Sequence, residues 1–73
     1  MIKPQVRISL TFVREFYYKW DSGAFPYIRM GQAFYNEFNL HKMQQDREWF
    51  DSLYNSDGVV AINMINSITD FSQ

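Results

Sequence analysis

The chain has 73 residues, no cysteine, a formal net charge of −1 and an aromatic content of 19%. A chain of this length forms one domain with one core, and without cysteine neither disulfides nor a thiolate metal site can stabilise it. The small net charge gives no general reason to expect that the protein binds nucleic acid, or that it is an acidic protein that imitates nucleic acid. The aromatic residues offer more surface than so small a core can bury, so we expect exposed aromatic side chains, which favour a partner surface or self-association.

The charges are divided unevenly along the chain. Residues 1–42 carry six basic and three acidic side chains, a balance of +3, whereas residues 43–73 carry one basic and five acidic side chains, a balance of −4. The first residues lack the uninterrupted apolar run of a signal peptide, and no stretch approaches the length of a membrane span. We therefore expect no membrane association, and we expect the protein to remain in the cytoplasm of the cell that makes it.

The N-terminal residues combine two patterns. Apolar and polar residues alternate over residues 6–12, as in a half-buried strand, but the helical period competes from Leu10 onward. A lone strand would be unstable. We therefore predict an extended arm over residues 1–8, an N-cap at Ser9 and a helix over about residues 10–20. The apolar side of this helix consists of Leu10, Phe12, Val13, Phe16, Tyr17 and Trp20.

The second helix follows a short turn. Residues 21–24 form this predicted turn, in which Gly23 takes a positive φ. Pro26 suits the first turn of a helix predicted over about residues 26–39, because its missing N–H has no partner there. Gly31 inside this helix favours close packing against the first or last helix over contact with a ligand. The helical period places five residues on the core-facing side: Tyr27, Met30, Gly31, Phe34 and Phe38.

A polar connection leads to the last two helices. The third helix is predicted over about residues 46–54, with Asp46 as its N-cap. Either Ser56 or Asp57 caps a fourth helix, predicted over about residues 58–69. Apolar residues fill about 200° of its circumference, so we expect it to be the most buried helix.

These elements predict one fold class. We expect an all-α protein, a compact bundle of three to four short helices with an extended N-terminal arm. Residues 1–73 would form this single small domain.

No residue pattern indicates an enzyme, a cofactor or a metal. The only histidine, His41, lies in a predicted loop without further ligands at metal-binding spacing. Asp46, Glu48 and Asp51 are better explained by the dipole of a short helix than by acid–base catalysis. The three glycines are isolated, so there is no phosphate-binding loop. We expect a non-enzymatic protein with no cofactor and no metal.

The polar side of the second predicted helix is the first candidate site. Arg29, Gln32, Asn36 and Asn39 share this side, and their donors and acceptors can hold a partner. We name these four residues the polar stripe. They can equally tie down the connections of this same fold, and that alternative stays open. Together with exposed aromatic residues, the predicted partner-binding residues are Arg29, Gln32, Asn36, Asn39, Tyr18 and Tyr35.

Basic residues near the first helix are the second candidate. Arg7, Arg14, Lys19 and Arg29 could face phosphates, with Tyr18 among them. A nucleic-acid-binding domain usually has a stronger positive charge and a docking motif, and this sequence has neither. A solvated helix face explains the same residues.

A resemblance to a known group of proteins is carried by three segments. These are residues 12–17 with Trp20, residues 26–36 with the pattern Pro-x-x-Arg-x-Gly-Gln-Ala-Phe-x-Asn, and Leu53-Tyr54 with Asp57. Over about residues 10–66 the chain is similar to small uncharacterised proteins encoded by bacteriophages and prophages. It departs from their pattern in the N-terminal arm and in residues 55–58. The shared pattern carries no assigned chemistry.

The resemblance implies a setting for the function. Phages encode many short, non-enzymatic proteins that bind a host enzyme or a defence enzyme. We therefore expect a phage-encoded interaction protein in the host bacterial cytoplasm, which binds and modulates or inhibits a host protein of transcription, DNA metabolism or antiviral defence. The alternatives are a nucleic-acid-binding accessory protein that uses the basic residues, and a homo-oligomer.

Overall fold

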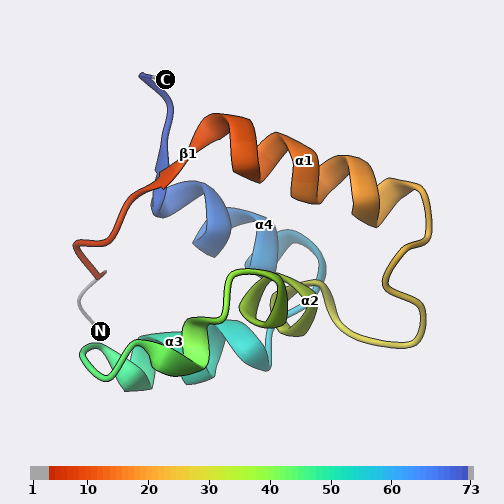
Figure 1. Ribbon diagram of the computed structural model, residues 1–73. Helices are drawn as coiled ribbons and strands as arrows, with labels where there is room; N and C mark the ends of the chain where they lie inside the picture. The colour runs from red at the N-terminus through yellow and green to blue at the C-terminus, as the bar shows by residue number, and fades with distance from the viewer. Residues whose placement is uncertain (1–3, 73) are drawn as a thin grey trace.

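Four α-helices build the fold within the described residues. The structure is a computed structural model, and it describes residues 4–72. The helices are α1 (Leu10–Asp21), α2 (Met30–Glu37), α3 (Arg47–Tyr54) and α4 (Gly58–Ser67), with a 3₁₀ turn, η1, at Leu40–Lys42 (Figure 1). Two short strands, β1 (Ile8–Ser9) and β2 (Thr69–Asp70), flank α1 and α4. The predicted all-α bundle of short helices is confirmed.

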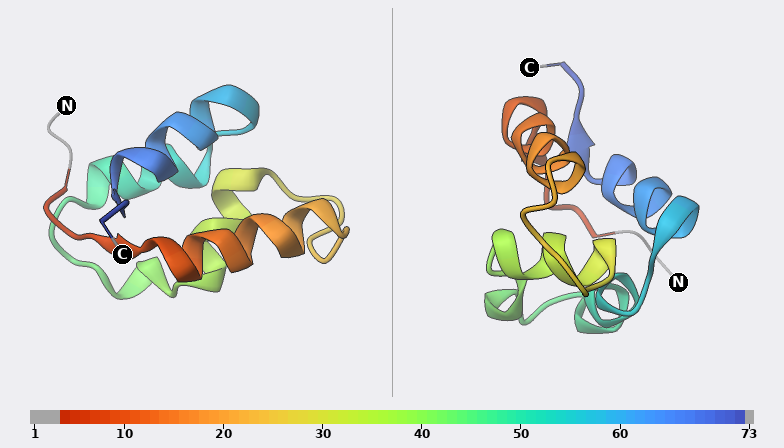
Figure 2. Two further views of the ribbon diagram at one scale, coloured as in Figure 1. Left: turned by 90° about the horizontal axis from the view of Figure 1, so that it is seen from above. Right: turned by 90° about the vertical axis from the view of Figure 1, so that its right-hand side faces the viewer.

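The helices surround a core to which all four contribute. In Figure 1, α1 lies on one side of the molecule, α2 and α3 lie on the opposite side, and α4 lies between them. Figure 2 shows the C-terminal segment beside the start of α1, where β1 and β2 pair. The rings of Phe16 and Phe34 meet edge to face at 5.0 Å between centroids. The fully buried large side chains are Pro4, Val13, Phe16, Phe34, Leu40, Leu53, Ile65 and Ile68.

The N-terminal arm is docked rather than free. Ile8 and Ser9 pair in parallel with Thr69 and Asp70, and the Ile8 N–H donates to the carbonyl of Ile68 at 2.8 Å. Residues 1–3 of the predicted arm lie outside the described residues. The strand that lacked a local partner in the sequence pairs with the other end of the chain.

The boundaries of α1 agree with the prediction, whereas α2 is shorter than predicted. Ser9 caps α1, because its Oγ accepts from the Thr11 N–H at 3.3 Å. The prediction of a second helix from residue 26 is wrong, because Tyr27 has a φ of +68° and keeps the preceding residues in a turn. Tyr27 is fully exposed, not part of the core-facing side. At the other end, Asn39 has a φ of +54°, so α2 ends at Glu37, before the predicted end at about residue 39.

The last two helices begin close to their predicted starts. Asp46 occupies the position before α3, but its φ is +58° and its side chain makes no capping hydrogen bond. Asp57, one of two predicted caps, accepts from the Gly58 N–H. The expectation that α4 is the most buried helix is wrong. Of its ten residues only Ala61 and Ile65 are buried.

Gly31 is the point where two backbones approach each other. A Cβ atom on Gly31 would lie 1.7 Å from the Leu53 carbonyl oxygen and 2.7 Å from that of Ser56. The Gly31 N–H donates to the same Ser56 oxygen at 3.0 Å. The predicted close packing is confirmed, but the approaching segment is the end of α3 and its link to α4, not the first or last helix.

Asp57 connects the starts of two helices. Its carboxylate accepts from the N–H of Met30 at 3.1 Å and from that of Gly58 at 2.9 Å, the first residues of α2 and α4. These two hydrogen bonds lower the pKa of Asp57, and the nearby charge of Arg29 adds a smaller lowering. One carboxylate therefore caps α2 and α4 together.

We predict that Gly31→Ala destabilises the protein by more than about 3 kcal/mol, because the added methyl group meets backbone atoms that cannot move aside locally. Gly58→Ala is the matched control, since Gly58 has a φ of +57° but open space around it. It should cost only about 1 kcal/mol of backbone strain. Urea unfolding measures both, and equal losses would contradict the close approach at Gly31.

Asp57→Asn is predicted to change how stability depends on pH. A carboxyl group with a lowered pKa in the folded state stabilises above its unfolded pKa of about 4, and the contribution is lost as the pH falls through the folded value. The parent should therefore be more stable than the variant near neutral pH, and the difference should shrink in acid. Urea unfolding at several pH values measures this, and a difference that does not vary with pH would contradict the double cap.

Candidate functional site

The structure divides the predicted polar stripe. Gln32 and Asn36 lie on α2, whereas Arg29 precedes the helix and Asn39 follows it in a left-handed conformation. Arg29, Asn36 and Asn39 are exposed, and Gln32 is half-buried. Because α2 is short, the helical period relates only Gln32 to Asn36. Their role in binding stays a prediction.

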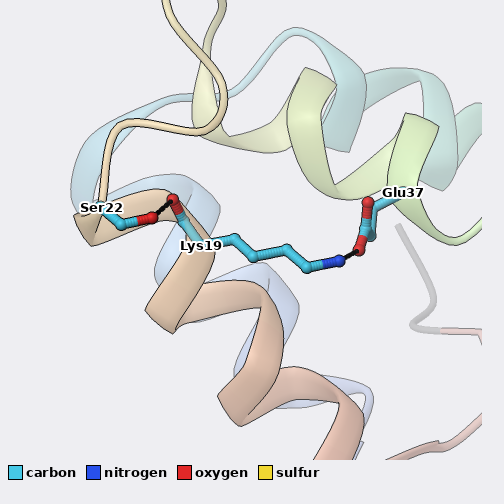
Figure 3. Close-up of polar contacts among 3 residues, drawn as sticks. All are labelled: Lys19, Ser22 and Glu37. Carbon is cyan, nitrogen blue, oxygen red and sulfur yellow. Dashed lines mark hydrogen bonds and ion pairs between the residues drawn. The ribbon is translucent and has the colours of Figure 1, made fainter.

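Side-chain contacts border α2 on two sides. Lys19 Nζ and Glu37 Oε2 lie 2.6 Å apart and join α1 to α2, and the pair raises the pKa of Lys19 (Figure 3). The same figure shows Ser22 Oγ donating to the Lys19 carbonyl at 2.9 Å, which closes the end of α1. On the side towards α3, the rings of Tyr35 and Tyr54 meet edge to face at 5.0 Å. The prediction that Tyr35 is exposed is therefore wrong, because Tyr54 covers part of its ring.

The basic residues have different neighbours. Arg7 Nη1 donates to the Ser67 carbonyl at the end of α4 at 2.8 Å, whereas Lys19 turns towards α2. Arg14 is exposed on α1, and Arg29 lies at the start of α2. Two of the four predicted phosphate-facing residues thus make contacts within the fold.

Tyr18 is the predicted exposed aromatic residue, and the structure confirms its exposure at 77%. It lies on α1 opposite the buried Val13 and Phe16, so it belongs to a different helix from Gln32 and Asn36. The six predicted partner-binding residues are therefore spread over α1, α2 and the two ends of α2.

The acidic side chains and the histidine that the sequence singled out lie on the surface of the described part of the chain. His41, Asp46, Glu48 and Asp51 are all exposed. Within residues 4–72, no three His, Cys, Asp or Glu residues gather closely enough to hold a metal ion. No helix among these residues has the length and apolar character needed to cross a bilayer.

The outer side of α4 is a surface that sequence reasoning missed. Val59 is 71% exposed and Val60 59% exposed. Asn63 and Asn66 lie exposed further along the same helix. We name these four residues the α4 face. No charged residue occurs in α4, whereas the outer sides of α1 and α3 carry several. The uncharged run over residues 58–69 is the sequence signal for this surface, whereas the wide apolar arc of the same helix predicted burial.

The two valines have no evident role in folding. An exposed valine in a helix loses side-chain freedom relative to alanine and gains little from burial. The buried side chains here are Ala61 and Ile65, with Ile68 just after the helix, and Ile62 and Met64 pack against the core while partly buried.

Comparison with known protein families, with curated proteins and with solved structures finds no match to this chain. The resemblance to bacteriophage proteins therefore stays a prediction.

We predict that Val59→Ala and Val60→Ala leave stability unchanged or raise it by up to about 0.5 kcal/mol each, because alanine has the higher helix propensity. Ile65→Ala, on the buried side of the same helix, should lose about 2–5 kcal/mol. Urea unfolding compares the three variants. A loss at Val59 or Val60 similar to that at Ile65 would show that the valines serve the core.

Proposed function

We propose that this chain is a small non-enzymatic protein, encoded by a phage or prophage, that binds a host bacterial protein in the cytoplasm and modulates or inhibits it. The target would belong to transcription, DNA metabolism or antiviral defence. The proposal draws on the sequence resemblance and on the surface of the fold.

The chain has the surface area of a compact monomer. Its accessible surface is 4988 Å² for 8.8 kDa, close to the roughly 4,800 Å² that the size scaling of compact monomers gives. No buried side-chain nitrogen or oxygen among the described residues lacks a hydrogen-bond partner. A partner is therefore not needed to complete the core, which suits a module that folds first and binds afterwards.

One observation carries the proposal: α4 exposes two adjacent valines on a face without charge. Depletion of charge around exposed apolar side chains is typical of the centre of a protein–protein interface. A catalytic site requires titratable or nucleophilic groups at defined positions, and this face offers only valine and asparagine.

The nucleic-acid alternative has less support. Affinity for nucleic acid comes mainly from cations placed on phosphates. Arg7 and Lys19 already contact a carbonyl and a carboxylate within the fold. We therefore keep nucleic acid as an outcome of the test below rather than as a second proposal.

We expect tagged chain to retain one bacterial protein from lysate at near-stoichiometric amounts, with or without nuclease treatment, as identified by mass spectrometry. The matched control is Phe34→Asp, which places a charge in the core and should abolish the retention by unfolding the chain. Retention that vanishes with nuclease would contradict the proposal and favour nucleic acid. No retained protein, together with a sedimentation mass that is a multiple of 8.8 kDa, would contradict it in favour of self-assembly.

A further inference from the structure

We infer that residues 4–9 form a strap, which opens while the helices stay packed and exposes a binding site for an extended segment of the partner protein. The site consists of the end of α4 and β2, residues 67–70, and we name it the strap site. The strap already occupies this site within the chain, so its own sequence shows which kind of segment fits. The inference rests on the proposed function only in assigning that segment to a host protein.

The strap contacts the fold through one side of an extended chain. Pro4 is fully buried, and Val6 and Ile8 pack against the core while partly buried. Gln5 and Arg7, which lie between them, are exposed. This period of two residues is that of a strand with one side covered. A segment that replaces the strap therefore needs apolar side chains at every second position.

Backbone hydrogen bonds fix the register of the strap. The Ile8 N–H donates to the Ile68 carbonyl at 2.8 Å, and β1 pairs in parallel with β2. Pairing through the main chain does not depend on which side chains the added strand carries. An extended segment of another protein can therefore make the same hydrogen bonds once the strap has left.

The end of α4 favours a basic residue in the segment. Arg7 Nη1 donates to the Ser67 carbonyl at 2.8 Å. The last carbonyl groups of a helix have no partner within the helix, and they form the negative end of its dipole. Asp70 in β2 brings a carboxylate to the same end. The segment that fits the strap site therefore has a cation between two apolar residues, as Arg7 has in the strap.

Opening of the strap leaves the junction of the helices intact. That junction consists of the hydrogen bonds from Gly31 to Ser56 and from Met30 to Asp57, and the strap is not part of it. Strands of two residues add little stability of their own, and Pro4 is the one strap residue that is buried. Segments with few buried side chains open at a lower free energy than the core does.

A segment of a different protein suits the strap site better than the strap of a second copy. β1 leads directly into α1 at Leu10, and Ser9 is both the last residue of the strap and the N-cap of α1. A strap exchanged between two copies would bring its own α1 to the place where the first copy already has α1, unless Ser9 gave up its capping position. A free segment of a partner has no such constraint.

Native-state hydrogen exchange on the full isotope-labelled chain tests the opening. The Ile8 amide should exchange at least about a hundredfold faster than the Gly31 amide, after correction for their intrinsic rates, because the strap opens without global unfolding. Equal exchange of the two amides would overturn the inference, since the strap would then open only when the whole chain unfolds.

Two variants that weaken the strap prepare the binding test. Ile8→Pro removes the N–H that donates to Ile68, and the φ of proline suits an extended chain. Arg7→Ala removes the guanidinium from the Ser67 carbonyl, and it replaces Ile8→Pro if that variant does not fold. The matched control is Gln5→Ala, because Gln5 is an exposed residue of the strap.

The probe is a synthetic peptide with the strap sequence Pro-Gln-Val-Arg-Ile-Ser, blocked at both ends. NMR titration should move the amide signals of Ile68, Thr69 and Asp70. The peptide should bind Ile8→Pro at least about tenfold more tightly than it binds the parent or Gln5→Ala, because the open state is more populated. A strap with only a structural role predicts no such gain. Equal binding to all three, or no binding to the weakened variants, would overturn the inference.

Two control peptides test which chemistry the strap site selects. A peptide with aspartate in place of its valine and isoleucine should not bind, because a charge then replaces each apolar side chain. A peptide with glutamate in place of its arginine should bind at least about tenfold more weakly. Equal binding of the arginine and glutamate peptides would overturn the basic nature of the segment.

The lysate experiment separates this inference from the proposed function. A host protein that Ile8→Pro retains in larger amounts than the parent and Gln5→Ala supports both. A host protein that all three retain equally overturns the use of the strap site and leaves the proposed function intact. Peptide binding at residues 68–70 with no retained host protein does the reverse.

Discussion

The fold depends on a backbone contact that only glycine permits. At Gly31 the first turn of α2 lies against the end of α3, and the Gly31 N–H bonds to the Ser56 carbonyl. One residue later, Asp57 accepts from the first N–H groups of α2 and of α4. This junction determines where α4 begins, and the helical period then determines which of its side chains turn inward.

The same junction explains the character of the surface. Once α4 starts at Gly58, its inward positions are Ala61 and Ile65, and the two valines of the first turn face outward. Neither α1 nor the docked N-terminal arm covers them, although both contact the far end of α4. Part of the apolar surplus of the sequence therefore appears as the uncharged face of α4, which is the basis for proposing a protein-binding role, and the rest is exposed elsewhere, at Phe12, Tyr18, Tyr27, Met43 and Phe71.

Local sequence patterns predicted much of this fold and little of its surface. Capping by Ser9 and Asp57 and the packing role of Gly31 follow from local chemistry, so they were predictable. The pairing of β1 with β2 was not, because two-residue strands about 60 positions apart leave no local pattern. The shortening of α2 arises from the left-handed Tyr27, which residue type does not indicate. The sequence shows that Val59 is apolar, but it cannot show how much of the surface of α4 the neighbouring elements cover.

Native-state hydrogen exchange tests the junction most directly. The account predicts that the amide protons of Met30 and Gly31 exchange only through global unfolding, with the free energy that urea unfolding gives, because opening them separates α2 from α3 and α4. Exchange of these two amides at a much lower free energy, while the amides of Phe16 and Phe34 stay protected, would contradict the claim that the fold depends on this contact.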